Sequence, residues 1–436
     1  MHQKMYLKAL VLYLLTWIAT GAYQPPENNI GDESSIFFKV YGEVYPRGHY
    51  TVIITFGQAN ESYVLDIDTG NALTWLQCDT LFSAPHIPYI PQGYLTCDDP
   101  ICGSLQLPVD RRCSNSEDQC DYLVKYADHG SFSGSLVKDS VQLHLPNRTL
   151  IEAQLVFGCG YSQESQNLTR LPYVDGVLGL GKGNSSILTQ LHSMGRTRNV
   201  FGHCFSRQGG GGYLYFGGDD LHHSNSSEIV WTPSLNQRDN YNAGSADLEY
   251  FGLQATNNSI IKGLEGVVFD SGSTYTYLTS QAYGDLVSMI KKDLEGNDKI
   301  VAVEDGYLPM CWKGAESEPF QTIDDAIKNF KLLVLSFRNE ETVEFMMGPE
   351  SYLVFTCTLR STHLNRSIFA TMTLTGICLI QETKIACLGI LNGTTIGLGN
   401  TNIIGDISMQ DNLVIYDNEK NRVGWAPANC STDPKP

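Results

Sequence analysis

The chain of 436 residues is short of charge, and the charge it carries is unbalanced. Charged residues make up 17% of it, with 29 Lys and Arg against 47 Asp and Glu, and the formal net charge is -18. A surface this acidic repels phosphate backbones, so we expect no nucleic-acid partner. The acidity fits a protein that works at low pH, and it equally fits one that gains only solubility from it.

Long apolar runs are missing beyond the N-terminus, which argues against a membrane span. At the N-terminus itself, Lys4 and Lys8 precede a short apolar stretch over 9–18, and small residues follow up to Ala22. This pattern predicts a secretory signal peptide over residues 1–22. A signal anchor is the alternative, but the apolar stretch is shorter than the roughly 20 residues that a bilayer requires.

Closely spaced metal-binding cysteines are missing too. The 12 cysteines include Cys97-x4-Cys102 and Cys113-x6-Cys120, which lack the two-residue spacing of zinc ribbons. An even number of cysteines behind a signal peptide indicates disulfides, so we expect no metal and no organic cofactor. Frequent N-x-S/T sequons also predict a secreted glycoprotein. The sequons lie at Asn60, Asn147, Asn167, Asn184, Asn225, Asn257, Asn365, Asn392 and Asn429.

Short alternating or apolar segments between glycine and asparagine breaks dominate the rest of the chain, which predicts a mainly β protein. Helical spacing occurs over 186–195 and 280–294.

The organisation follows from the same patterns. We expect a spacer or short pro-segment over 23–47, an N-terminal lobe over 48–230 with a Cys-rich insertion at 78–120, a C-terminal lobe over 231–430, and a tail over 431–436.

Two short motifs recur in the same order in both halves. Each half has an apolar strand ending in Asp-(Thr/Ser)-Gly, followed later by two apolar residues and glycine. A single Asp-Thr-Gly is usually a turn, but the matched order indicates a duplicated lobe. The motifs are Asp68-Thr69-Gly70 with Val177-Leu178-Gly179, and Asp270-Ser271-Gly272 with Ile403-Ile404-Gly405.

A duplicated lobe would bring Asp68 and Asp270 together. Two adjacent carboxyls share one proton, so one acts as a base toward water while the other protonates a peptide carbonyl. Gly70 and Gly272 permit the close approach, and the hydroxyls of Thr69 and Ser271 are suited to bonding across the two loops. The pattern predicts peptide-bond hydrolysis at acidic pH without a covalent intermediate.

At this point the sequence resembles the pepsin-like aspartic proteases, and within them the plant nucellin-like and nepenthesin-like branch, over about residues 48–430. The motifs that carry the resemblance are GHYTVIITFG, LDIDTGNALTWLQCD, QCDYLVKYADHGS, FGCGY, DGVLGLGKG, FGHCF, FDSGSTYTYL, CLGILNG and NIIGDISMQDNLVIYD. The resemblance implies an all-β bilobal fold with a cleft between pseudo-twofold-related lobes.

The resemblance also assigns residues. It implies catalytic Asp68 and Asp270, a flap tyrosine at Tyr126, and Trp75 as the indole that holds that tyrosine. Plain core packing is the alternative for both aromatic residues. The family's cleft binds an extended peptide with apolar subsites.

For the cysteines, the resemblance suggests pairs Cys159–Cys430 and Cys311–Cys387, although connectivity does not follow from sequence. Three departures stand out. Asn71 occupies a position that is usually Ser, which predicts an altered pH dependence. A cysteine pair usually found after WLQCD is missing, which leaves Cys78 without its usual neighbour.

The third departure is an extra segment over about 354–379 that contains Cys357 and Cys378. It begins as a translated intron would, so we interpret it as a retained intron or gene-model error. A surface loop closed by Cys357–Cys378 is the alternative.

The leading interpretation is a monomeric, secreted aspartic endopeptidase of the apoplast or vacuole. A binding protein on the same fold, similar to plant xylanase inhibitors that lost catalytic residues, is the alternative. A structural glycoprotein is favoured only by the sequons. The intact acids and glycines favour the enzyme.

Overall fold

The computed structural model describes residues 35–57, 61–78, 88–105, 113–126, 130–146, 149–164, 174–208, 210–218, 228–235, 240–251, 260–306, 308–338, 342–358 and 383–432. The predicted signal peptide lies outside these ranges, as do most of the sequons. Among the residues within them, no helix combines the length and the apolar character that crossing a bilayer requires.

The described chain is built mainly from β-strands, as predicted. Its first part contains β1 (Ile36–Glu43), β2 (His49–Phe56), β3 (Glu61–Asp68), β4 (Trp75–Gln77), η2 (Cys102–Ser104), β5 (Asp121–Lys125), β6 (Ser131–His144), β7 (Leu150–Glu164), β8 (Gly176–Gly179), α2 (Ile187–Ser193), β9 (Val200–Phe205), β10 (Gly212–Phe216) and β11 (Val230–Pro233). The helix α2 lies within the predicted helical stretch.

The second part contains the other predicted helical stretch as α3. Its elements are β12 (Tyr241–Asn242), β13 (Ala246–Tyr250), β14 (Ile260–Leu264), β15 (Val267–Phe269), β16 (Thr276–Leu278), α3 (Ser280–Asp293), β17 (Ile300–Val303), β18 (Cys311–Gly314), α4 (Ile323–Ile327), β19 (Leu333–Arg338), β20 (Thr342–Met347), η4 (Pro349–Ser351), β21 (Leu353–Thr358), β22 (Thr383–Leu388), β23 (Ile390–Asn392), η5 (Gly393–Ile396), β24 (Asn402–Ile404), α6 (Asp406–Met409), β25 (Asn412–Asp417) and β26 (Arg422–Pro427).

The N-terminal lobe is one large sheet with strand order β11-β26-β25-β9-β10-β1-β2-β3-β8-β4-β7-β6-β5. The strand β1 corrects one prediction. Residues 36–43 were expected to belong to a spacer or short pro-segment, but they form a strand inside this sheet. The strand alternates, with Ile36, Phe38 and Val40 buried, and it pairs with β2 on one side and β10 on the other. Burying one face of an alternating strand is what fixes it in the sheet.

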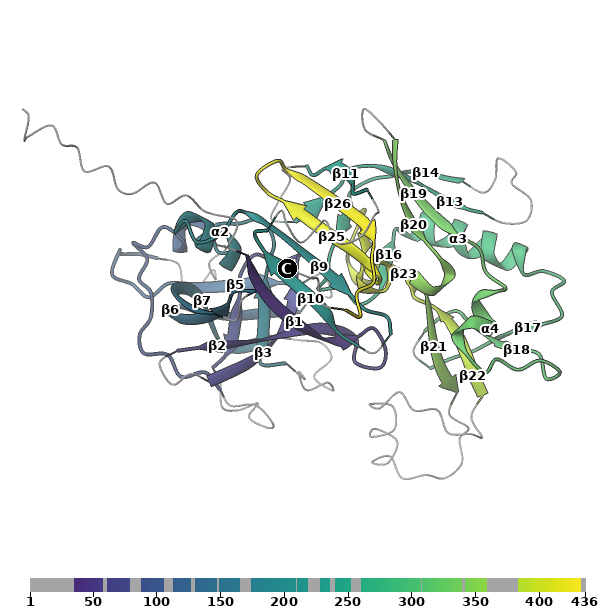
Figure 1. Ribbon diagram of the computed structural model, residues 1–436, viewed down its shortest axis with the longest axis horizontal. Coiled ribbons are helices and arrows are strands. Elements are labelled where there is room, and N and C mark those ends of the chain that lie inside the picture. Colours follow the sequence, from purple (N-terminus) through teal and green to yellow (C-terminus); the bar gives the residue numbers. More distant parts are fainter. Residues whose placement is uncertain are drawn as a thin grey trace, which may run out of the picture.

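The C-terminal lobe divides into three smaller sheets, ordered β12-β15-β24-β16-β23, β14-β13-β19-β20 and β17-β18-β22-β21. The helix α3 packs on β14, β16 and β23 through its buried face, which includes Leu286 and Ile290. In Figure 1 this lobe, in green, lies beside the purple and teal N-terminal lobe.

The last strands of the chain lie between the lobes rather than wholly in the second one. The strand β25 pairs with β9 of the N-terminal lobe, and β26 pairs with β11. In Figure 1 the yellow β25 and β26 lie next to β9. A boundary drawn along the sequence therefore does not separate the two units.

The two repeats form the same strand pattern. In the first lobe β3 pairs in parallel with β8, which is antiparallel to β4; in the second, β15 pairs in parallel with β24, which is antiparallel to β16. The glycine of each second motif makes room for this crossing. A Cβ at Gly179 would lie 2.5 Å from the carbonyl carbon of Leu73, and one at Gly405 would lie 2.1 Å from the oxygen of Tyr275.

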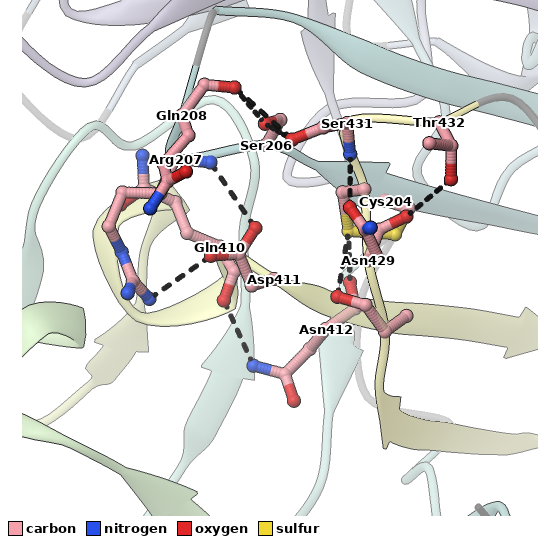
Figure 2. Close-up of a disulfide and its surroundings, with 12 residues drawn as sticks. Cys204, Ser206, Arg207, Gln208, Gln410, Asp411, Asn412, Asn429, Ser431 and Thr432 are labelled. Atoms are coloured by element: carbon pink, nitrogen blue, oxygen red, sulfur yellow. Dashed lines mark hydrogen bonds and ion pairs between the residues drawn. A yellow bond between two sulfur atoms is a disulfide. The ribbon is translucent and has the colours of Figure 1, made fainter. Parts of the chain in front are cut away.

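Five disulfides join described cysteines, and one of the two pairs suggested by resemblance is wrong. The pair Cys311–Cys387 forms between register partners on β18 and β22. The pair Cys159–Cys430 does not form: Cys159 bonds to Cys78, and Cys430 bonds to Cys204 (Figure 2). The other two pairs staple the Cys-rich insertion: Cys97–Cys113 and Cys102–Cys120.

The register explains the correction. The parallel pairing of β4 and β7 places Cys159 opposite Leu76, two residues from Cys78. Cys78, expected to lack a neighbour, thus has one across the sheet.

The extra segment joins two paired strands. Residues 354–358, expected to begin the segment, belong to β21, which pairs along its length with β22. The proposed Cys357–Cys378 bond and the remainder over 359–379 lie outside the described residues. The strands on either side thus form an ordinary hairpin stem in the C-terminal lobe.

Candidate active site

The two Asp-(Thr/Ser)-Gly loops interlock at the base of the cleft. The backbone N–H of Ser271 donates to Oγ1 of Thr69 at 3.0 Å, and the N–H of Thr69 donates to Oγ of Ser271 at 3.2 Å. Each hydroxyl also donates to the opposite strand: Thr69 to the carbonyl of Phe269 at 3.1 Å, and Ser271 to that of Ile67 at 2.7 Å. These buried bonds tie one lobe to the other at the point where the carboxyls meet.

Each loop glycine faces the carboxyl of the other lobe. A Cβ at Gly70 would lie 2.6 Å from Oδ1 of Asp270, and a Cβ at Gly272 would lie 2.5 Å from Oδ1 of Asp68. A methyl group at either position would collide with the opposite carboxyl. The N–H groups of the glycines also donate to their own loop's carboxyl, at 2.8 Å to Asp68 and 3.0 Å to Asp270.

Both carboxyls are held in a setting that favours the protonated form. Burial raises the pKa of Asp68 well above its usual value, and the nearby carboxyls of Asp270 and Asp66 raise it further, against N–H donation from Gly70 and Asn71. Burial also raises the pKa of Asp270, against hydrogen bonds from Ser273, Gly272 and Gly70. Such a pair retains one shared proton over a wide pH range.

The two loops differ at the residue after the glycine. The hydroxyl of Ser273 donates to Oδ2 of Asp270 at 2.9 Å. The side chain of Asn71 instead turns back on its own loop, where its amide donates to the carbonyl of Leu73 at 3.1 Å and its oxygen accepts from the N–H of Leu73 at 3.2 Å. The carboxylate of Asp270 thus accepts a hydrogen bond from a side chain of its own loop. The side-chain amide of Asn71 donates to the backbone instead of to Asp68.

Two further carboxyls that the sequence did not single out lie close to the pair. Asp66 precedes Asp68 by two residues on β3, and Asp406 starts α6 directly after Gly405. Burial raises the pKa of each well above its usual value, and the other carboxyls add to the rise. One oxygen of each is buried without a hydrogen-bond partner among the described residues. Period-2 alternation along the strand was the one available signal for Asp66.

A buried histidine stands behind the loops. His203 on β9 contacts the hydroxyl of Tyr416 at 3.2 Å, and Tyr416 in turn bonds to Thr69. Burial lowers the pKa of His203 to about 3. This histidine therefore remains neutral over most of the acidic range.

The predicted flap contact is present. Nε1 of Trp75 donates to the hydroxyl of Tyr126 at 2.7 Å, and the indole stacks on Phe132 with ring centroids 3.8 Å apart. The flap role and plain core packing are therefore not exclusive. Trp75 packs in an apolar cluster with Leu73, and its indole also donates to Tyr126. Tyr126 lines the cleft directly.

The cleft has a volume of about 680 Å³. Both carboxyls and both glycines of the paired loops line it. Its walls mix polar and apolar side chains. The apolar ones come from both lobes and the Cys-rich insertion: Leu73, Leu105, Leu123, Val124, Val268, Tyr277, Ile396, Leu398 and Ile403. This shape and lining suit an extended chain with apolar side chains.

Two clusters in the described chain bring three potential metal ligands together, Cys97 with Cys102 and Cys113, and Asp305 with Cys311 and Cys387. All of these cysteines are engaged in disulfides, so they supply no thiolate.

Comparison with known proteins identifies the family. The domain family described as Xylanase inhibitor N-terminal matches residues 50–218, and Xylanase inhibitor C-terminal matches 361–427. An aspartic proteinase of Oryza sativa subsp. japonica is 35% identical over 417 residues, covering 92% of this chain and 93% of that protein. Aspartic proteinase 36 of Arabidopsis thaliana is 26% identical, covering 89% and 75%.

Solved structures agree on the fold. Basic 7S globulin from soybean superposes with a TM-score of 0.64 at 16% identity, covering 92% of this chain and 98% of that one. Conglutin gamma from lupine seeds gives a TM-score of 0.65 at 17% identity, covering 91% and 95%. Taken with the paired loops and the cleft, these similarities show that the chain belongs to the pepsin-like aspartic protease family, in the plant branch that the xylanase-inhibitor domains describe.

Proposed function

We propose that the protein is a secreted aspartic endopeptidase of the nucellin-like and nepenthesin-like branch. The observation that carries the proposal is the mutual fit of the two loops, in which each glycine leaves room for the opposite carboxyl. Such a close approach has no evident use in packing, and it costs stability because both carboxyls are buried. It supplies what a shared-proton dyad requires.

In the proposed mechanism, the ionised carboxyl removes a proton from a water molecule as that water attacks the peptide carbonyl, and the neutral carboxyl protonates the carbonyl oxygen. As the tetrahedral intermediate collapses, the carboxyl that took the water proton gives it to the leaving nitrogen, and the other carboxyl takes back a proton from a hydroxyl of the intermediate. We assign the base role to Asp270, whose charge the hydroxyl of Ser273 stabilises, and the acid role to Asp68.

The substrate class follows from the cleft. An extended peptide would lie across the two loops with its apolar side chains against the walls, and the flap carrying Tyr126 would cover it. Closure would exclude water from the reacting bond. We propose the apoplast or the vacuole as the site of action, where acidic pH keeps one proton on the pair, and a monomer as the working form.

The test is cleavage of an unfolded protein or peptide mixture by the purified protein between about pH 3 and 5, the range in which such a pair holds one proton. We expect pepstatin-sensitive cleavage that Asp68→Asn and Asp270→Asn each abolish. The matched control is Asp298→Asn, at an exposed aspartate of the C-terminal lobe, which should retain activity. Full activity in both dyad variants would contradict the proposal.

A binding protein is the second candidate, because the matching domain families are named for xylanase inhibitors. It predicts a folded protein that cleaves nothing over the same pH range and inhibits a xylanase in a binding assay. The intact pair of carboxyls favours the protease.

A further inference from the structure

The C-terminus carries a glycosylation sequon whose middle residue is a disulfide cysteine. After β26 the chain runs through Asn429, Cys430 and Ser431. The side chain of Asn429 is exposed, whereas Cys430 is buried and bonded to Cys204 on β9 (Figure 2). One tripeptide thus offers an acceptor for a glycan and a partner for a disulfide.

In the folded structure, the hydroxyl of the sequon's Ser431 is engaged in hydrogen bonds. Oγ of Ser431 lies 2.8 Å from Oγ of Ser206 and 3.2 Å from the carbonyl oxygen of Gln208 (Figure 2). The N–H of Ser431 donates to Oδ1 of Asn429 at 3.1 Å. Glycosylation depends on the Ser or Thr of the sequon, so the enzyme must reach that hydroxyl together with the asparagine amide. In the closed arrangement the hydroxyl is therefore held by the body of the protein, and the amide oxygen of Asn429 is bound to the backbone of its own tripeptide.

Closure of this arrangement must await much of the fold. Cys204 and Cys430 are 226 residues apart, and the pairing of β25 with β9, which places Leu413 opposite Cys204, is what brings them together in the fold. Closing so long a loop costs more chain entropy than closing a short one. Contacts at the β25 corner then hold the segment, including the N–H of Arg207 to Asp411 at 3.3 Å and the N–H of Ala428 to the carbonyl of Asp411 at 3.0 Å.

We propose that Asn429 is an N-glycan acceptor in chains that have not yet closed the Cys204–Cys430 disulfide, and that closure ends its availability. The inference goes beyond the protease activity and rests on the secretory route proposed above. The two outcomes compete for the same undocked segment. Because Asn429 is exposed, a chain that receives the glycan first can still close the disulfide afterwards.

Glycosylation and disulfide closure are separate reactions of neighbouring residues. In glycosylation, Nδ2 of Asn429 bonds to the anomeric carbon of an oligosaccharide, the carrier lipid pyrophosphate leaves, and the amide loses one proton. In closure, one thiolate attacks a mixed disulfide formed by the other cysteine with a thiol–disulfide oxidoreductase. That oxidant accepts two electrons and is released as its dithiol.

The experiment is site occupancy by mass spectrometry, measured on total cell-associated protein from a eukaryotic secretory host. The full chain carries a signal peptide of proven efficiency, so that entry into the pathway is not in question. The test variant is Cys204→Ser, which prevents closure and leaves the sequon intact. Measuring the total pool includes chains that fail to fold.

Two controls separate the disulfide from folding in general. Asn184 begins another described sequon, in which Asn184 is exposed and Ser186 is buried with its hydroxyl donating to the carbonyl of Gly179. This sequon contains no cysteine. The double variant Cys311→Ser with Cys387→Ser removes a disulfide in the other lobe.

We expect occupancy of Asn429 to be partial in the natural chain and to rise by about twofold or more in Cys204→Ser, since disulfide formation takes seconds to hours. Occupancy of Asn184 should not change, and Asn429 should not respond to loss of Cys311–Cys387. Equal occupancy of Asn429 with and without Cys204 would overturn the proposal, as would an equal rise in the double variant. If the protease assay fails while Cys204→Ser raises occupancy, the proposed function fails and this inference stands.

Discussion

The two catalytic loops are copies of one design that have diverged at one position. Both place a carboxyl after a buried strand, both use glycine to admit the opposite carboxyl, and their hydroxyls bond across the interface. They differ because Ser273 donates to Asp270, whereas Asn71 binds its own backbone at Leu73. Both loops thus contribute equally to bringing the two carboxyls close together. The side chain of Ser273 alone favours the charge on Asp270 rather than on Asp68.

The symmetric part predicts the largest effects. In Gly70→Ala the new methyl group would lie 2.6 Å from Oδ1 of Asp270, and in Gly272→Ala 2.5 Å from Oδ1 of Asp68. We expect each to lower kcat/KM by about a hundredfold or more, since small displacements of reacting groups have effects of this size. The measurement is peptide cleavage at the pH optimum.

The control for these variants is Gly103→Ala, where a Cβ would meet no atom within 4 Å. A large loss in one loop and none in the other would show that the copies are not equivalent.

The bond between Trp75 and Tyr126 lies in the N-terminal lobe, and its loss should have the next largest effect on activity. Trp75 lies seven residues after Asp68, and Tyr277 lies at the matching place after Asp270. Trp75→Phe removes the hydrogen bond to Tyr126 and leaves an aromatic ring on Phe132. We expect kcat/KM to fall by about tenfold, because a lost hydrogen bond is worth about 1.4 kcal/mol.

Tyr277→Phe is the comparison for this prediction and should have less effect. An equal loss in the two variants would mean that the flap bond is not what distinguishes the halves.

The difference between Ser273 and Asn71 predicts a shift of one limb of the pH profile. Ser273→Ala removes a donor to the Asp270 carboxylate and therefore raises the pKa of Asp270. The acid limb of kcat/KM should move to higher pH by about one unit. Ser273→Thr, which retains the hydroxyl, should restore the profile.

Asn71→Ala should leave both limbs in place, since the Asn71 side chain bonds to Leu73. A shift of the acid limb in Asn71→Ala and none in Ser273→Ala would reverse our assignment of the base.

The two further carboxyls, Asp66 and Asp406, predict the smallest effect on activity and a measurable effect on the free energy of unfolding. Burial raises the pKa of Asp66, so the folded protein holds that proton more tightly than the unfolded chain does. The resulting stability is complete below the unfolded pKa of about 3.9 and is lost as pH rises through the folded pKa. Asp66→Asn cannot ionise, so it should lose less stability between pH 4 and pH 7.

Between pH 4 and pH 7, the free energy of unfolding of Asp66→Asn should therefore rise relative to that of the natural chain. We expect about 1.4 kcal/mol for each unit by which the pKa is raised within this range. Urea unfolding at the two pH values measures it. Asp406→Asn is the matching change in the other lobe. His203 acts in the opposite direction, because its pKa of about 3 removes stability as pH falls from 6.5. An unchanged pH dependence in both aspartate variants would mean that the other two carboxyls carry it.

The carboxyl pair could be predicted because the same motif recurs in both halves of the sequence. The flap contact and the bond Cys311–Cys387 were predicted only from the resemblance to the family. The sequence did not allow the partner of Cys159 to be predicted, since that depends on the parallel register of β4 and β7. The strand Ile36–Glu43 was missed although its alternation is clear, because a polar stretch precedes it. Asp406 was missed for another reason, since it lies in the second lobe and only the folded structure buries it near the carboxyls of Asp66 and Asp68 in the first.

The shared sheet between the lobes makes the first lobe depend on strands that come much later in the chain. Until β25 arrives, β9 presents an unpaired row of backbone groups, and such edges invite pairing with other chains. A chain that stops before Asn412 would carry both catalytic loops intact and still expose this edge. Loss of β25 and the residues after it should therefore appear first as aggregation of the newly made protein rather than as a loss of catalytic chemistry.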